Sequence, residues 1–169
     1  MNKPAFQPSL KGRALRLLSQ REHSRAELER KLAPHETTPG ELAQALNELQ
    51  ARDFINDDRA VDSVVYRRAG KLGAARIRQE LAAKGLTGEA VAQVMEGLRD
   101  SEYPRALAVW RKKFDAAPTD PRARAKQVRF LMTRGFSAEV VRQVVRQMGQ
   151  GIEDPSDHPT DTTAGDWAE

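Results

Sequence analysis

Residues 81–87 read LAAKGLT, and residues 131–137, fifty positions later, read LMTRGFS. Each copy joins an apolar stretch to a basic residue, a glycine, an apolar residue and a hydroxyl residue. An internal repeat of this period is typical of small helical units that stack in tandem.

The glycine of each copy is predicted to be a structural cap. Gly85 and Gly135 stand where a helix ends in the left-handed conformation, which glycine adopts without a side-chain clash. The preceding basic residue then faces the negative end of the helix dipole. The apolar residue after the glycine is expected to pack on the helix, and the hydroxyl is expected to cap the next helix. The expected contacts are Leu86 on Leu81 and Phe136 on Leu131, with Thr87 and Ser137 as caps.

The rest of the chain predicts further helices. Apolar residues recur at intervals of three and four, and alternation typical of strands is almost absent, which indicates an all-α protein of nine helices. Helix starts are indicated by residues that cap a first turn or place a proline in it. These signals are Ser9, Ser24 with Glu27, Thr38 with Pro39 and Glu41, Asn56, and Asp120 with Pro121.

The architecture expected from these helices is three tandem three-helix repeats in an elongated, curved array. The first unit fits the same frame at a shift of 49 residues, with a looser connection at residues 34–38 in place of the tight turn. The predicted division is a flexible N-terminus at 1–8, repeats at 9–70, 71–116 and 117–148, and a disordered acidic tail at 149–169.

Charge distribution indicates the class of partner. Residues 1–148 hold 28 basic and 18 acidic residues, a net charge of +10, whereas the tail holds six acids and no Lys or Arg. An excess of this kind suits a partner that carries phosphates or carboxylates. The chain has no cysteine, no signal-like segment and no stretch of roughly 20 apolar residues, so we expect a cytoplasmic protein without a membrane span.

Catalytic chemistry is not indicated. The three histidines are too scattered for two to share a helix face, and no phosphate-binding glycine loop is present. Asp57 and Asp58 are adjacent in a predicted first turn, where acids commonly serve the helix dipole. We expect no enzyme activity, no cofactor and no metal site.

Three segments carry a family resemblance. Residues 54–60 (FINDDRA), 73–86 (GAARIRQELAAKGL) and 129–137 (RFLMTRGFS) resemble, in order and spacing, the signature stretches of the RecX family. The resemblance implies a cytoplasmic regulator that binds the RecA filament on single-stranded DNA and suppresses its ATPase, strand-exchange and coprotease activities in recombinational repair and the SOS response. The loose turn of the first unit and the acidic tail depart from the family pattern.

The basic residues of the second and third units are the candidate binding site. On a curved array, rows of such residues are expected to line one concave groove that contacts the filament or its DNA. The candidates are Arg67, Arg68, Lys71, Arg76, Arg78, Lys84, Arg111, Lys112, Lys113, Arg122, Arg124, Lys126, Arg129, Arg134, Arg142 and Arg146. A set of scattered, solvated side chains is the alternative.

Two other functions remain open from the sequence. One is a module that binds nucleic acid directly, in which each helix pair works like a helix-turn-helix. The other is a helical scaffold for an unrelated protein, with Trp167 or the groove as its contact. In each case we expect the protein to be a monomer. A further hypothesis is that the acidic tail masks the basic groove.

Overall fold

The computed structural model describes residues 8–149, and these form nine α-helices and one short 3-10 helix. The predicted flexible N-terminus up to residue 7, the tail from residue 150 and Trp167 lie outside the described residues. The helices are α1 (Leu10–Leu18), α2 (Arg25–Leu32), η1 (Ala33–His35), α3 (Glu41–Ala51), α4 (Asp57–Arg68), α5 (Ala74–Ala83), α6 (Glu89–Asp100), α7 (Glu102–Arg111), α8 (Pro121–Met132) and α9 (Ala138–Gly149).

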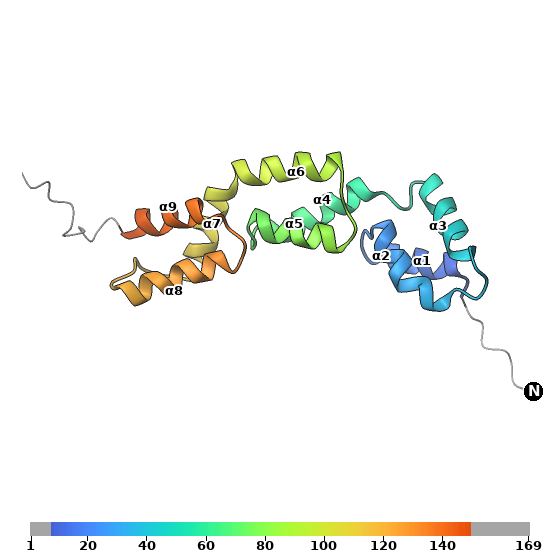
Figure 1. Cartoon of the computed structure of the whole chain (residues 1–169), viewed down its shortest axis with the longest axis horizontal. Helices are drawn as coiled ribbons and strands as arrows, with labels where there is room; N and C mark the ends of the chain where they lie inside the picture. Colours follow the sequence, from blue (N-terminus) through green and yellow to red (C-terminus); the bar gives the residue numbers. More distant parts are fainter. Residues whose placement is uncertain (1–7, 150–169) are drawn as a thin grey trace, which may run out of the picture.

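The helices form three units in an elongated, arched row (Figure 1). Each unit has its own buried apolar cluster: one within α1–α3, one within α4–α6 and one within α7–α9. We call these units 1, 2 and 3. The all-α repeat architecture expected from the sequence is therefore confirmed.

The cores place the unit divisions differently from the sequence-based ones at residues 70 and 116. Ala60 and Val61 of α4 pack with Ile77 of α5, so α4 opens unit 2 and does not close unit 1. Likewise Trp110 of α7 packs with Leu131 of α8 in unit 3. The reason is that the apolar stripes of α4 and α7 face the helices that follow them.

Both glycine turns have the predicted geometry. Gly85 and Gly135 have φ angles of 72° and 82°. The Leu86 N–H donates to the Leu81 carbonyl at 3.0 Å, and the Phe136 N–H makes the equivalent bond at 3.4 Å. These bonds satisfy carbonyls that a helix end leaves without partners, so the turns are Schellman closures.

Two predicted caps are wrong. Residue Gly88, with φ 92°, precedes α6, and no side chain caps the helix there, so Thr87 is not the cap. Gly40 precedes α3 in place of Thr38, and Glu36 Oε1 accepts from the Gly40 and Leu42 N–H groups. In both cases a glycine with a positive φ angle moves the helix start beyond the hydroxyl. The predicted caps that accept a first-turn N–H are Ser9, Ser24, Asn56, Asp120 and Ser137.

Candidate interaction surfaces

Positive charge is concentrated in unit 3. Residues 101–149 contain 11 basic and four acidic residues, a net charge of +7. Residues 8–56 and 57–100 contain eight basic and seven acidic residues each, a net charge of +1 per segment. Units 1 and 2 are nearly balanced, so the basic excess inferred from composition belongs to one end of the molecule.

Unit 3 presents its basic side chains in rows. Arg122, Lys126 and Arg129 are spaced by four and three residues on α8 and therefore share a helix face. Arg142 and Arg146 share a face of α9, which packs on α8. These five side chains are exposed, as are Arg124 of α8 and Arg111, Lys112 and Lys113 at the end of α7.

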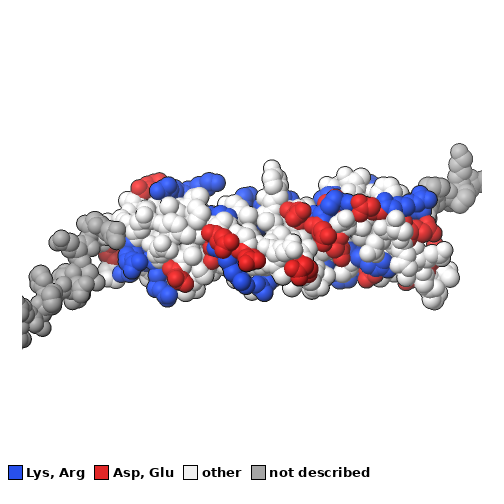
Figure 2. All heavy atoms as spheres, turned by 90° about the horizontal axis from the view of Figure 1, so that it is seen from above, with Lys and Arg blue, Asp and Glu red and all other residues white. Residues whose placement is uncertain are grey.

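Five of the candidate basic residues in unit 2 are exposed, and one of these forms a salt bridge. Arg67, Lys71, Arg76 and Arg78 are exposed. Arg68 is also exposed, but its guanidinium forms a salt bridge with Glu80 Oε2 at 2.8 Å. The face shown in Figure 2 accordingly mixes acidic and basic patches along its length.

Lys84 and Arg134, the basic residues that precede the turn glycines, are half-buried and make internal contacts. Lys84 Nζ lies 2.8 Å from Glu27 Oε1. The Arg134 guanidinium lies 3.7 Å from the centroid of the Phe130 ring and donates to the Phe130 carbonyl. Both side chains are therefore occupied in holding the fold.

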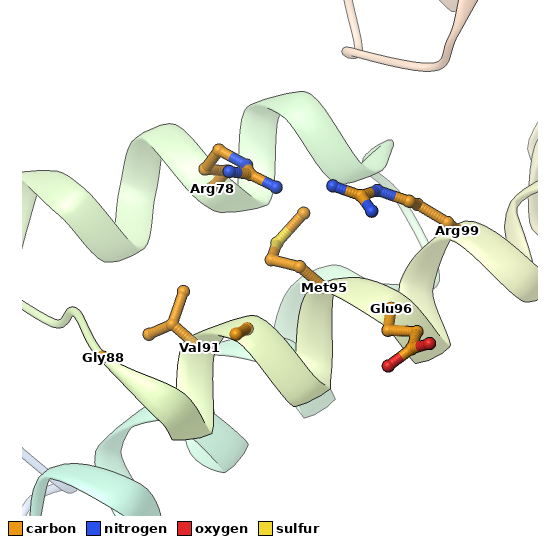
Figure 3. Close-up of a pocket in the computed structure, with 7 residues that line it drawn as sticks. Arg78, Gly88, Val91, Met95, Glu96 and Arg99 are labelled. Carbon is orange, nitrogen blue, oxygen red and sulfur yellow. The ribbon is translucent and has the colours of Figure 1, made fainter.

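A groove lies between α5 and α6 (Figure 3). Its volume is 510 Å³, and its floor includes buried Met95 and half-buried Val91. Arg78 of α5 and Arg99 of α6 extend toward each other over Met95. Arg99 is not among the sequence candidates, because a single arginine at a helix end shows no pattern. The other lining residues are Gly88, Ala92 and Glu96.

Three large apolar side chains are exposed among the described residues. Tyr66 of α4 is 90% exposed, and Phe54 and Met132 are 47% and 43% exposed. Met132 follows Arg129 by one helical turn and so extends the α8 row with an apolar contact. The spacing of apolar residues in the sequence does not distinguish these three exposed side chains from buried ones.

The contact between units 1 and 2 is built around a buried carboxylate. Glu27 of α2 lies 2.8 Å from both Arg21 Nη2 and Lys84 Nζ, and the Ser24 hydroxyl donates to the Lys84 carbonyl. Burial raises the pKa of Glu27, but hydrogen bonds from Arg21, Lys84 and the Ser24 N–H lower it to about 2. The carboxylate is therefore charged at neutral pH and satisfied by two cations.

His23 is buried beside this carboxylate. Its side chain is 1% exposed, and Nδ1 lies 3.0 Å from the Arg21 carbonyl, which requires Nδ1 to carry the proton. Burial is the main reason that the pKa of His23 is lowered, with the charges of Arg21 and Lys31 acting in the same direction. His23 is thus a neutral, structural histidine.

The contact between units 2 and 3 uses backbone groups. The Gly73 N–H donates to the Arg134 carbonyl at 2.9 Å, and the Ala75 N–H donates to the Gly135 carbonyl at 3.2 Å. A Cβ atom on Gly73 would lie 2.2 Å from the Gly135 carbonyl carbon. Only glycine at position 73 permits this approach.

Two charged residues of α7 complete that contact. Buried Glu102 accepts from the Ala74 N–H at 3.0 Å and so caps α5. Arg105 donates to the carbonyls of Ala69, Leu72 and Leu98. Sequence reasoning missed both residues, because their partners are 28 to 36 positions away, apart from Leu98.

Other classes of site are not found in the part of the chain that the structure describes. No group of three or more His, Asp or Glu side chains there is placed to hold a metal ion. No described helix has the length and apolar character that crossing a membrane requires.

Family models match all three units in order. Residues 11–49 match the first three-helix domain of RecX, residues 56–95 match the second and residues 100–145 match the third. The matched ranges agree with the three apolar cores.

Similar proteins cover most of the chain. A regulatory protein RecX from Leptothrix cholodnii is 54% identical over 145 residues, which are 86% of this chain and 91% of the relative. Another from Ralstonia nicotianae is 46% identical over 151 residues, covering 89% of this chain and 94% of the relative. A crystal structure of RecX from Lactobacillus salivarius has a TM-score of 0.69 at 21% identity, covering 83% of this chain and 95% of that one, and supports the fold.

Proposed function

This chain belongs to the RecX family, and we propose that it is a non-enzymatic, cytoplasmic regulator that binds the RecA filament on single-stranded DNA. Binding inhibits the ATPase, strand-exchange and coprotease activities of RecA, and thereby modulates recombinational repair and the SOS response. The observation that carries this proposal is the ordered match of all three helical units to the three RecX domains.

The shape of the molecule supports a filament as the partner. Three units in one elongated row offer a long surface on which many weak contacts can form. The groove between α5 and α6 is large enough for a short peptide segment but not for a surface of that length. A filament presents the same surface at regular intervals, so a tandem array gains effective concentration with each unit that binds.

The charge of unit 3 supports an acidic or phosphate-bearing contact there. The exposed rows of α8 and α9 carry Arg122, Lys126, Arg129, Arg142 and Arg146 without a salt bridge to any described carboxylate. Positive potential adds over such a cluster and speeds association with a polyanion. We therefore propose that unit 3 makes the strongest electrostatic contact with the filament.

The test is the single-stranded-DNA-dependent ATPase of RecA, titrated with the purified protein at physiological salt, beside binding to the same DNA without RecA. We expect inhibition at concentrations that leave bare DNA unbound. Absence of inhibition, together with tight binding to bare DNA, would instead favour a nucleic-acid module.

A charge-reversal variant locates the contact. Replacing Arg122, Lys126 and Arg129 by Glu should weaken inhibition by at least about tenfold, because each lost phosphate or carboxylate contact is worth about a kcal/mol. The matched control replaces three exposed basic residues of unit 1, with the same change in net charge. That control is Arg16→Glu, Arg30→Glu and Arg52→Glu. Equal loss in both variants would show that net charge alone matters.

The alternative function, direct binding of nucleic acid, has one observation in its favour. The basic excess of +7 in unit 3 suits phosphate contacts on bare DNA. If the protein binds DNA directly, its affinity for DNA should fall steeply as salt is added. When several phosphates are contacted, each doubling of the salt concentration should lower the affinity about tenfold. Inhibition of RecA would then track DNA occupancy at every salt concentration.

A further inference from the structure

We propose that the groove between α5 and α6 is the binding site of the chain's own C-terminal segment, residues 166–169 (DWAE). The segment joins an indole to two flanking carboxylates, Asp166 and Glu169. The groove joins an apolar floor to two guanidinium groups. The contact goes beyond filament binding, because it is internal to the molecule.

The charges of groove and segment are complementary. Arg78 and Arg99 form no salt bridge with any carboxylate of the described residues. Their guanidinium groups point toward each other above Met95 (Figure 3), where they would donate hydrogen bonds to the carboxylates that flank the indole. The carboxylate of Glu96 points away from both (Figure 3).

The floor of the groove suits an indole. Met95 supplies a thioether, Val91 a branched side chain and Ala92 a methyl group. Contact between a thioether and an aromatic ring is favourable, and an arginine stacked on an indole adds a cation-π interaction. The volume of 510 Å³ exceeds what one indole needs and leaves room for its neighbours.

The chain is long enough to reach the groove. A path along α9 and α7 leads from the end of α9 to Arg99 at the end of α6, and the two helices have 12 and 10 residues. At a rise of 1.5 Å per residue, and with about 10 Å added for crossing from one helix axis to the next, this path is about 43 Å long. Trp167 lies 18 residue steps beyond Gly149, and an extended chain of that length spans about 60 Å.

The route also passes basic side chains. The segment between α9 and Asp166 carries four acids, Glu153, Asp154, Asp157 and Asp161, and no Lys or Arg. It leaves unit 3, whose described residues carry the net charge of +7. Electrostatic attraction therefore favours a return of the tail along its own unit over extension away from it.

Disulfide trapping in the full chain tests the contact. The chain contains no cysteine, so a double variant forms a single kind of intramolecular bond. Ala92→Cys with Ala168→Cys joins groove to segment. The matched control, Ala125→Cys with Ala168→Cys, places the first cysteine on exposed, basic α8 beside α9. Rates are measured in a glutathione buffer at low salt and low protein concentration, with non-reducing gels to separate monomers from dimers.

We expect the groove pair to form its disulfide at least about tenfold faster than the control, because binding raises the effective concentration of the two thiols. Replacing Arg78 and Arg99 by Gln, or Trp167 by Ser, should remove this preference. Faster reaction of the control pair would mean that the tail only adheres to unit 3. Disulfides that appear solely between two molecules would identify a second copy as the occupant. Either result would overturn the proposal.

The contact has a consequence that rests on the proposed function. A bound tail covers Arg78 and places acids near unit 3, so deletion of residues 150–169 should tighten binding to the RecA filament. Because the trapping experiment contains neither RecA nor DNA, its failure is distinguishable from a failure of filament binding.

Discussion

The two contacts between successive units occupy equivalent positions but use different chemistry. In each, the start of the unit's second helix meets the glycine turn of the next unit: Ser24 meets the turn at Gly85, and Gly73 meets the turn at Gly135. The first contact depends on side-chain charges, Glu27 with Arg21 and Lys84. The second has backbone–backbone bonds and the absence of a side chain at residue 73 at its centre. The charged side chains that complete it, Glu102 and Arg105, bond backbone groups of unit 2 and not a charged partner there.

Successive repeats can therefore keep the same geometry of contact while the interaction that stabilises it changes. A buried ion pair responds to pH and to loss of either partner, whereas a close backbone contact responds to added volume. The contact of units 1 and 2 is therefore expected to be the pH-sensitive one, and that of units 2 and 3 the sterically intolerant one.

The largest expected effect comes from adding one methyl group to the second contact. Gly73→Ala should lower the free energy of unfolding by about 3 kcal/mol, because its Cβ would lie 2.2 Å from the carbonyl carbon of Gly135. Urea denaturation measures the change. Gly70→Ala is the matched control, since nothing lies within 4 Å of a Cβ there. Similar losses in both variants would contradict the close contact.

The two turn glycines should differ when each is replaced by alanine. Both positions have positive φ angles, which cost an alanine roughly 1–2 kcal/mol. At Gly135 the Cβ also meets the Arg76 backbone nitrogen at 2.6 Å, whereas at Gly85 it meets only the Ala26 side chain. We expect Gly135→Ala to be the more destabilising variant.

A double variant separates the φ strain at position 85 from the contact with Ala26. Ala26→Gly removes the atom that Gly85→Ala would touch, so the pair should be less destabilised than the sum of the two single variants. Additive free energies of unfolding would show that φ strain alone limits position 85.

Neutralising the buried carboxylate should break the first contact and spare the second. Glu27→Gln is expected to cost about 2 kcal/mol, because Arg21 and Lys84 lose their shared anion. The control is Glu29→Gln. Glu29 forms a solvent-exposed salt bridge with Arg25, so its loss should lower the free energy of unfolding by less than about 0.5 kcal/mol. A loss of comparable size in both variants would refute the importance of burial.

The smallest expected effect is a pH dependence of stability from His23. Its folded-state pKa lies below 6.5, so the unfolded chain binds more protons as the pH falls through 6.5, and stability decreases there. Glu27 adds a second loss as the pH falls from about 4.5 toward 2. Urea midpoints at pH 7.5 and 5.5 should differ less in His23→Asn than in the native chain, and an unchanged difference would exclude His23 as the cause.

The local structure was predictable where the signal is local. The turns at Gly85 and Gly135 follow from residues a few positions apart, and the Schellman bonds form within one helical turn. The caps Thr38 and Thr87 were mispredicted for the same reason: a neighbouring glycine competes for the helix start, and sequence alone does not fix its φ angle.

The sequence predicted which type of residue forms the candidate site, but not where on the surface the site lies. Composition showed a basic excess, and the family motifs indicated a partner. The groove is lined by Arg78 and Arg99, which come from two different helices. Lys84 and Arg134 make internal contacts with Glu27 and Phe130, so they are not available to a partner. A side chain's freedom to bind depends on its spatial neighbours, which sequence spacing does not give.

The all-α class, the glycine turns, the basic excess and the family could all be predicted from the sequence, because helical periodicity, capping and motif order are encoded over short spans. Which helices share a core, and which interactions join the units, became evident from the packed structure. The buried charges of Glu27, Glu102 and Arg105 and the bare backbone at Gly73 meet partners that are far apart in sequence. Their stability comes from satisfying polar groups removed from water, and that condition exists only once the units have packed.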